Sequence, residues 1–197
     1  MTLSRTSSRW QIGAIVGLII AVALFRVLRA TLLPGLPNFS PLMAAAFCGG
    51  LFLPGALAWT LPIAAIALSD LALSRALGYP IFDIGQMAGW VCLVAAVASG
   101  RWAARWKQLR FGRLAALLFA NALAFYLVTN AVCWAVMEPA YPGGFGGLVQ
   151  ALTIGLPGYP PTWMFFRNSL ASDFLFAALI LAVGYLACRP SEDPVTA

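Results

Sequence analysis

Five polar side chains lie in or beside long apolar runs of the sequence: Asp70, Asn130, Arg167, Asn168 and Asp173. Bringing an ionisable side chain into the core of a bilayer costs about 2.5 to 3.5 kcal/mol on insertion scales, so such groups normally face a bundle interior or a polar cavity. Together they offer carboxylate, guanidinium and amide groups that can hold a polar ligand, and a carboxylate can also act as a general base. The pattern therefore predicts an enclosed site.

The composition indicates which elements must position these groups. With 62% hydrophobic and 9% charged residues, a chain of 197 residues is typical of an integral membrane protein. A membrane-spanning helix needs about 20 mostly apolar residues, and six stretches approach this length: about 10–27, 41–57, 59–73, 84–99, 114–137 and 170–188. We predict an all-α membrane protein of six helices forming a single domain over residues 1–197. Pro62 suggests that the third helix is tilted or broken, and Leu53-Pro54-Gly55 predicts a tight turn before it.

Basic residues predict the orientation of this bundle, because Lys and Arg collect in cytoplasmic loops. Eight of them fall before the first stretch, between the fourth and fifth, or after the sixth: Arg5, Arg9, Arg101, Arg105, Lys107, Arg110, Arg113 and Arg189. Both termini are therefore expected in the cytoplasm, and the first run is retained as a helix instead of a cleaved signal peptide. The net charge of +6 indicates topology and contact with membrane lipids, and we expect no nucleic-acid partner.

Three connections are then expected on the outer side, at about 33–41, 75–83 and 138–163. The first contains Asn38 and Ser40, which could bond a ligand at the mouth of the bundle; alternatively, Ser40 before Pro41 is a helix cap only. The third is long, and its apolar middle at 148–156 predicts a small re-entrant or interfacial helix.

The polar residues of the spans fall at one depth in this arrangement. Asn130 and Trp134 share a face in the outer half of the fifth helix, Arg167 and Asn168 begin the sixth, and Asp173 follows about one turn further in. Asp70 lies toward the outer end of the third helix. One interpretation is a ligand site. The other is that Asp70, Asn130, Arg167 and Asp173 bond one another between helices.

The same residues carry a resemblance to the substrate-binding S-components of energy-coupling factor (ECF) vitamin transporters. The matching segments, in order, are Pro37-Asn38-Phe39-Ser40-Pro41 with Gly49-Gly50, Leu61-Pro62-Ile63 to Ser69-Asp70, Thr129-Asn130 with Trp134, Tyr141-Pro142, and Phe165-Phe166-Arg167-Asn168-Ser169 to Asp173. The resemblance spans about residues 26–188. It implies a six-helix S-component fold in the bacterial inner (cytoplasmic) membrane, with a vitamin site near the outer face beneath the three connections.

The resemblance also implies partners and a substrate. S-components usually work with a transmembrane coupling subunit and two ATPases; the coupling subunit grips small residues on the first helix, here Gly13, Ala14, Gly17, Ala21 and Ala23. Solitary members that take up cobalamin are similar in size and layout, and in them a cysteine thiolate coordinates the cobalt. Cys48 and Cys133 are the candidates for this one ligand, since Cys92 and Cys188 are expected deeper in the bundle. The chain is expected to have no cofactor of its own.

The leading hypothesis is therefore vitamin uptake, with cobalamin or a related corrinoid as the first substrate to consider. We expect the pocket to be lined by Asn38, Asp70, Tyr79, Trp134, Tyr141 and Trp163 above a polar floor of Asn130, Arg167, Asn168 and Asp173. An alternative is a transporter of another vitamin, and a second is a membrane-embedded enzyme that acts on a lipid or bound cofactor with Asp70 or Asp173 as general base. The sequence contains no His and no HExxH motif, which disfavours the enzyme. Thiolate-assisted removal of an upper cobalt ligand, or a scaffold role without a ligand, are further alternatives.

Overall fold

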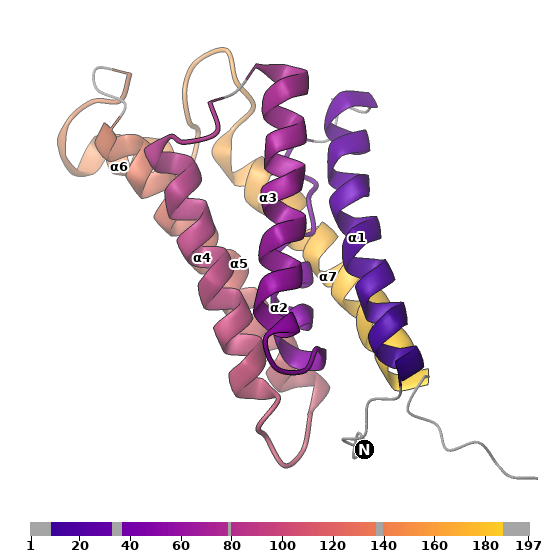
Figure 1. Cartoon of the computed structure of the whole chain (residues 1–197). Coiled ribbons are helices and arrows are strands. Elements are labelled where there is room, and N and C mark those ends of the chain that lie inside the picture. Colours follow the sequence, from indigo (N-terminus) through magenta and orange to yellow (C-terminus); the bar gives the residue numbers. More distant parts are fainter. Residues whose placement is uncertain (1–8, 33–36, 79, 137–139, 187–197) are drawn as a thin grey trace, which may run out of the picture.

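The computed structural model describes residues 9–32, 37–78, 80–136 and 140–186, and every regular element in these ranges is helical (Figure 1). The helices are α1 (Arg9–Leu32), α2 (Leu42–Phe52), α3 (Leu57–Leu77), α4 (Ile84–Ala103), α5 (Phe111–Val136), α6 (Gly144–Leu152) and α7 (Thr162–Leu186). Five of them, α1, α3, α4, α5 and α7, are long and apolar enough to cross a membrane. The prediction of an all-α membrane protein is confirmed at this level.

The count of six spans is not confirmed, because α2 occupies only part of the predicted second stretch. It has 11 residues, or roughly 16 Å at 1.5 Å per residue, against a hydrocarbon core of about 30 Å. Its limits follow from the chain on either side, since Pro41 precedes its first residue and the Leu53-Pro54-Gly55 turn follows its last. All residues from Met43 to Leu51 are buried, as expected for a short helix that is apolar all round.

Glycines allow α2 to lie against its neighbours at very short range. A Cβ added at Gly50 would lie 2.2 Å from the carbonyl oxygen of Val97 in α4, and one added at Gly100 in α4 would lie 2.1 Å from the carbonyl oxygen of Phe47. The backbones of α2 and α4 are therefore in direct contact. The surrounding core contains Phe47, Val97 and Ile180, so α2 forms the centre of the bundle.

The third predicted helix is continuous despite its proline. α3 runs unbroken from Leu57 to Leu77 with Pro62 in its second turn, and it ends at Gly78, whose φ of 76° closes the helix in the left-handed conformation. The Pro62 ring packs against α2, because a Cβ at Gly49 would lie 2.4 Å from Pro62 Cγ. The expected break is absent, and Pro62 instead makes a close contact between α2 and α3.

The connections gather as the sequence predicts. α1 and α3 end, and α4 and α7 begin, at the same end of the bundle (Figure 1). Residues 140–161, which include the short helix α6, lie at this end too, and the predicted small helix in this connection is thus present as Gly144–Leu152. The start of α1, the end of α7 and the basic connection between α4 and α5 lie at the opposite end.

Candidate functional site

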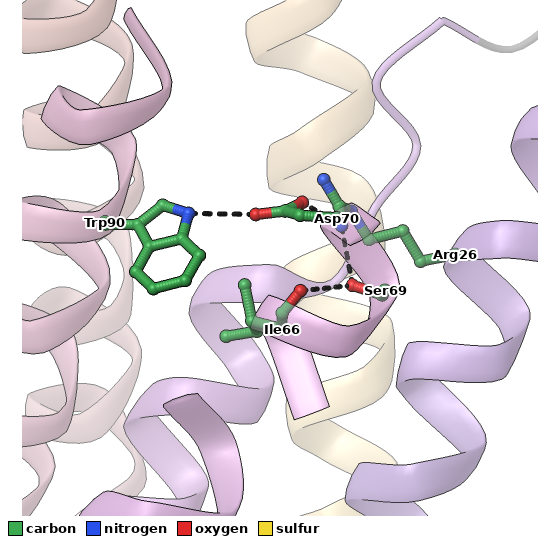
Figure 2. A network of polar contacts seen from close by, with 5 residues as sticks. All are labelled: Arg26, Ile66, Ser69, Asp70 and Trp90. Atoms are coloured by element: carbon green, nitrogen blue, oxygen red, sulfur yellow. Dashed lines mark hydrogen bonds and ion pairs between the residues drawn. The ribbon is translucent and has the colours of Figure 1, made fainter. Parts of the chain in front are cut away.

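A buried ion pair joins α1 to α3 (Figure 2). Asp70 of α3 pairs with Nη1 of Arg26 from α1, and its other carboxylate oxygen accepts a 2.9 Å hydrogen bond from the indole Nε1 of Trp90 in α4. The side chains of Arg26 and Asp70 are only 14% and 4% exposed. Burying both charges is tolerated because each neutralises the other and the carboxylate also accepts an N–H. Three helices are thereby linked through one carboxylate.

Ser69 fixes the guanidinium of Arg26 in this arrangement. Arg26 Nη1 donates to Ser69 Oγ at 2.6 Å, and Ser69 Oγ donates in turn to the carbonyl oxygen of Ile66 at 2.8 Å. The hydroxyl is thus oriented by its own helix, with its lone pairs available to Arg26 (Figure 2). The ion pair has a defined geometry before any ligand arrives.

The ion pair forms part of the wall of a cavity of about 390 Å³ at the end of the bundle where α1 and α3 finish. The lining comes from five helices and two connections: Arg26, Arg29, Ala30, Pro37, Asn38, Ser40, Leu42, Asp70, Leu73, Ser74, Leu77, Pro80, Ile81, Gln86 and Phe165. Charged and amide groups lie in it beside leucine, isoleucine and phenylalanine side chains. The cavity can therefore hold a small molecule with one polar and one apolar part.

The segment before α2 is held in place by α7. Asn168 Nδ2 and Ser169 Oγ donate to the carbonyl oxygens of Pro37 and Asn38, each at 2.9 Å. Asn38 has a φ of 58°, a left-handed conformation that Asn tolerates better than most residues. Predicted site residue Asn168 thus positions the segment, while Asn38 itself lines the cavity.

Ser40 is left with an unused hydroxyl. The residue is 7% exposed, and its Oγ has no hydrogen-bond partner within the described part of the chain. One interpretation of the sequence made Ser40 the cap of α2. The structure shows no such cap, because Pro41 occupies the N-cap position and Ser40 Oγ bonds none of the described residues. Ser40 is instead one of the residues that line the 390 Å³ cavity.

Asp173 caps α2 from another helix. Its Oδ1 accepts the backbone N–H of Ala44 at 2.9 Å, and the residue is 1% exposed. At the opposite end of α2, Arg101 Nη1 donates to the carbonyl oxygen of Leu53 at 3.2 Å. A carboxyl acceptor thus satisfies a backbone N–H at the N-terminus of α2, and the positive Arg101 at the C-terminus complements the helix dipole. Asp173 lies outside the lining of the larger cavity and borders a gap of about 20 Å³.

A second cavity of about 120 Å³ lies between α5 and α7, beside the same segment. Asn38, Tyr126, Thr129, Asn130 and Ser169 supply its polar lining. Asn130 Nδ2 donates to the carbonyl oxygen of Tyr126 at 2.7 Å, within its own helix. Asn130 therefore lines the smaller cavity together with Asn38, whereas Asp70 lines the larger one.

Several other predicted residues are absent from the lining of both cavities. Arg167 donates to Asn168 Oδ1 at 3.1 and 3.2 Å, and its guanidinium lies 5.4 Å from the ring centroid of Trp163. Trp134 Nε1 donates to the carbonyl oxygen of Pro142 at 3.3 Å. Neighbouring Tyr141 is buried; burial, followed by negative charge at Cys133, raises the pKa of its phenol. Tyr79 lies outside the described residues.

The two candidate cobalt ligands lie outside the lining of the larger cavity. Cys48 is fully buried within α2, in the apolar core. Cys133 is half-buried on α5, where a Cβ at Gly85 of α4 would lie 3.7 Å from its sulfur. Neither residue belongs to the lining of the 390 or 120 Å³ cavity. In the described ranges, no three His, Cys, Asp or Glu side chains come together in a way that could hold a metal ion.

The predicted network among Asp70, Asn130, Arg167 and Asp173 is absent from the described residues, because each of the four bonds a different partner. Sequence reasoning missed Arg26, Gln86 and Trp90 as residues of this site. Arg26 had a usable signal, since it is an arginine at the end of an apolar run at the same predicted depth as Asp70.

Comparison with known proteins gives a family for the chain. Residues 6–194 match a family described as "Family of unknown function (DUF6580)". The chain belongs to this family. No curated protein and no solved structure matches the sequence. The function of this DUF6580 member therefore has to be argued from the cavity and its lining.

Proposed function

We propose that the chain is a substrate-binding membrane protein that takes up a small vitamin-like solute across the bacterial inner membrane, in the manner of an ECF S-component. The observation that carries the proposal is the 390 Å³ polar cavity at one end of an otherwise apolar bundle. Polar groups in a membrane protein usually mark a substrate path. A cavity of this size with a few convergent polar groups is typical of a small-molecule site.

The charge distribution supports an outward-facing cavity. Arg101, Arg105, Lys107, Arg110 and Arg113 lie in or beside the connection at the opposite end of the bundle. Basic connections of this length remain in the cytoplasm. Both ends of the chain would then be cytoplasmic as well, and the cavity would open toward the side from which a nutrient arrives.

The surface of α1 supports a coupling partner. A Cβ added at Gly13 or Gly17 would meet nothing within 4 Å, so this face of α1 is unoccupied within the described part of the chain. Small residues at such positions let a second membrane helix approach closely. An ECF coupling subunit with its ATPases is the partner that the sequence resemblance implies; a solitary mode of action is the alternative.

The cavity favours a compact vitamin over a corrinoid. Its volume lies near the lower end of the range of about 300 to 1,000 Å³ for small-molecule pockets, and the candidate cysteines lie elsewhere. The enzyme alternative is also less well supported, because both candidate bases are already engaged, Asp70 by Arg26 and Trp90 and Asp173 by Ala44.

The proposal is tested by asking which solute the protein retains. Protein purified in nanodiscs is incubated with a mixture of water-soluble vitamins that includes cobalamin, desalted, denatured and analysed by mass spectrometry. We expect about one retained molecule per chain, and accumulation of the same compound by cells that express the protein. Retention of cobalamin would restore the corrinoid hypothesis.

A cavity-filling variant locates the site. Ala30 lines the cavity, whereas Ala98 on α4 is exposed on the outside of the bundle. Ala30→Trp should abolish retention, and the matched Ala98→Trp should retain as much as the wild type. No retained compound in the wild type, or equal retention by both variants, would contradict the proposal.

A further inference from the structure

The charges that line the 390 Å³ cavity do not balance. Among the described lining residues, Arg26 and Arg29 are positive and Asp70 is negative, which gives a formal charge of +1. Arg26 and Arg29 are three residues apart on α1, so they share one face of that helix. The cavity therefore has a positive side formed by α1.

The single negative group is not presented to a ligand as a free carboxylate. Asp70 is 4% exposed, pairs with Arg26 and accepts the Trp90 indole N–H at 2.9 Å (Figure 2). A cationic ligand that sought this carboxylate would have to displace two protein donors. An anionic ligand instead meets the guanidinium side of the pair without breaking it.

Ser40 provides a second observation about this cavity, separate from the balance of charges. Buried hydroxyl groups nearly always have a hydrogen-bond partner. Ser40 is a buried residue of this lining, and its Oγ has no partner within the described residues. The amides of Asn38 and Gln86 lie in the same lining. These groups can all donate hydrogen bonds to oxygen atoms of a ligand.

We infer that the ligand of this cavity is a small organic monocarboxylate whose carboxylate is bound by Arg26 and Arg29 with a hydrogen bond from Ser40; this inference rests on the proposed function. The planar guanidinium group matches a carboxylate in bidentate geometry. One surplus positive charge suits a monoanion better than a phosphate dianion. Leu73, Leu77, Ile81 and Phe165 provide an apolar wall for the rest of the molecule.

The test uses pairs of compounds that differ only in the charged group. Protein in phosphatidylcholine nanodiscs, which contain no anionic lipid, is titrated with nicotinate and nicotinamide, pantothenate and panthenol, and biotin and biotinamide, and binding is measured by calorimetry. In at least one pair the carboxylate should bind at least about tenfold more tightly, since its uncharged partner cannot form the charge-assisted hydrogen bonds. An uncharged member that binds as tightly as its carboxylate partner would overturn the inference. Displacement of the bound carboxylate by an equal concentration of inorganic phosphate would overturn it also, in favour of a phosphorylated ligand.

Variants separate binding from folding. Arg29→Gln should weaken carboxylate binding about tenfold and leave binding of the uncharged partner unchanged, and Arg29→Lys should retain part of the affinity. Ser40→Ala should weaken binding several-fold. Arg75→Gln is the matched control, because Arg75 is exposed at the same end of α3 but does not line the cavity. Equal loss for both members of a pair in Arg29→Gln would indicate a structural role for Arg29 and overturn the inference.

The outcomes also distinguish failure of this inference from failure of the proposed function. A neutral or cationic compound retained by the wild type, and lost in Ala30→Trp, would leave the proposed function standing and overturn the monocarboxylate. If none of the six compounds binds, the compound retained from the vitamin mixture decides by its charge. A monocarboxylate supports the inference, and a neutral or cationic compound overturns it. If nothing is retained at all, the proposed function fails and this inference fails with it.

Discussion

Asp70 shows at the residue scale how a membrane protein can contain a buried charge. A carboxylate and a guanidinium each lose several kcal/mol of solvation on burial, and their attraction offsets this loss only with good geometry and further hydrogen bonds. Both conditions hold here, because Ser69 orients Arg26 and Trp90 satisfies the second carboxylate oxygen. The pair is stable as a unit, whereas either charge alone is costly.

A double-mutant cycle on this pair should therefore be strongly non-additive. Arg26→Met and Asp70→Leu should each lower the free energy of unfolding by about 3 to 5 kcal/mol, and the double variant should recover most of that loss. Unfolding by SDS titration from mixed micelles measures all four proteins. Additive losses would show that the two charges do not depend on each other. The double variant should also bind the carboxylate probes about tenfold more weakly, as Arg29→Gln does, since it lacks one of their two arginines.

At the scale of the element, α2 is a helix that depends on its neighbours for both of its ends. An 11-residue helix is too short to be stable alone. It is stabilised by backbone contact with α4 through Gly50 and Gly100 and by a side-chain hydrogen bond at each terminus, made by Asp173 and Arg101. Because the 37–41 segment leads directly into α2, these contacts also position Asn38 and Ser40 in the cavity wall.

The Asp173 cap of α2 should contribute more to the free energy of unfolding than an exposed Asp cap does. Asp83 Oδ1 accepts the N–H of Gln86 at 2.7 Å at the start of α4, where it is exposed to solvent. Asp83→Ala should cost about 1 kcal/mol, the usual value for an N-cap. Asp173→Ala should cost about 1 to 3 kcal/mol, because water cannot replace the acceptor for the buried amide of Ala44. Asp173→Asn keeps an acceptor oxygen, so its cost in free energy of unfolding should lie between those of the other two variants.

The same SDS titration measures these three variants. Equal losses for Asp173→Ala and Asp83→Ala would show that the Ala44 amide finds another partner. A loss in Asp173→Asn as large as in Asp173→Ala would assign the effect to charge alone. In either case the description of Asp173 as the acceptor that α2 requires would be wrong.

At the scale of the whole molecule, hydropathy predicts some features of the fold and misses others. The five long helices follow from apolar runs of sufficient length, and the turn at Leu53-Pro54-Gly55 follows from its residue types. The length of α2 was overestimated because an apolar run does not show whether it faces lipid or protein. Asp70 was identified as a site residue because burial of charge is visible in a sequence. Its partner Arg26 is 44 residues away, and no pattern in a single sequence predicts the contact between α1 and α3. No such pattern predicts the hydrogen bond between Asp173 and a backbone amide either.

The orientation of the whole bundle is the last prediction. Phe82 in the connection between α3 and α4, and Gln108 in the connection between α4 and α5, are both exposed and lie at opposite ends of the bundle. In spheroplasts a membrane-impermeant maleimide should label the Phe82→Cys variant above the background of the native cysteines, and should label Gln108→Cys only after permeabilisation, because the positive connection stays inside. The opposite labelling pattern would place the Arg26–Asp70 cavity on the cytoplasmic side. A cavity on that side would receive its ligand from the cell interior, and uptake as the proposed direction of transport would then be wrong even if a carboxylate binds.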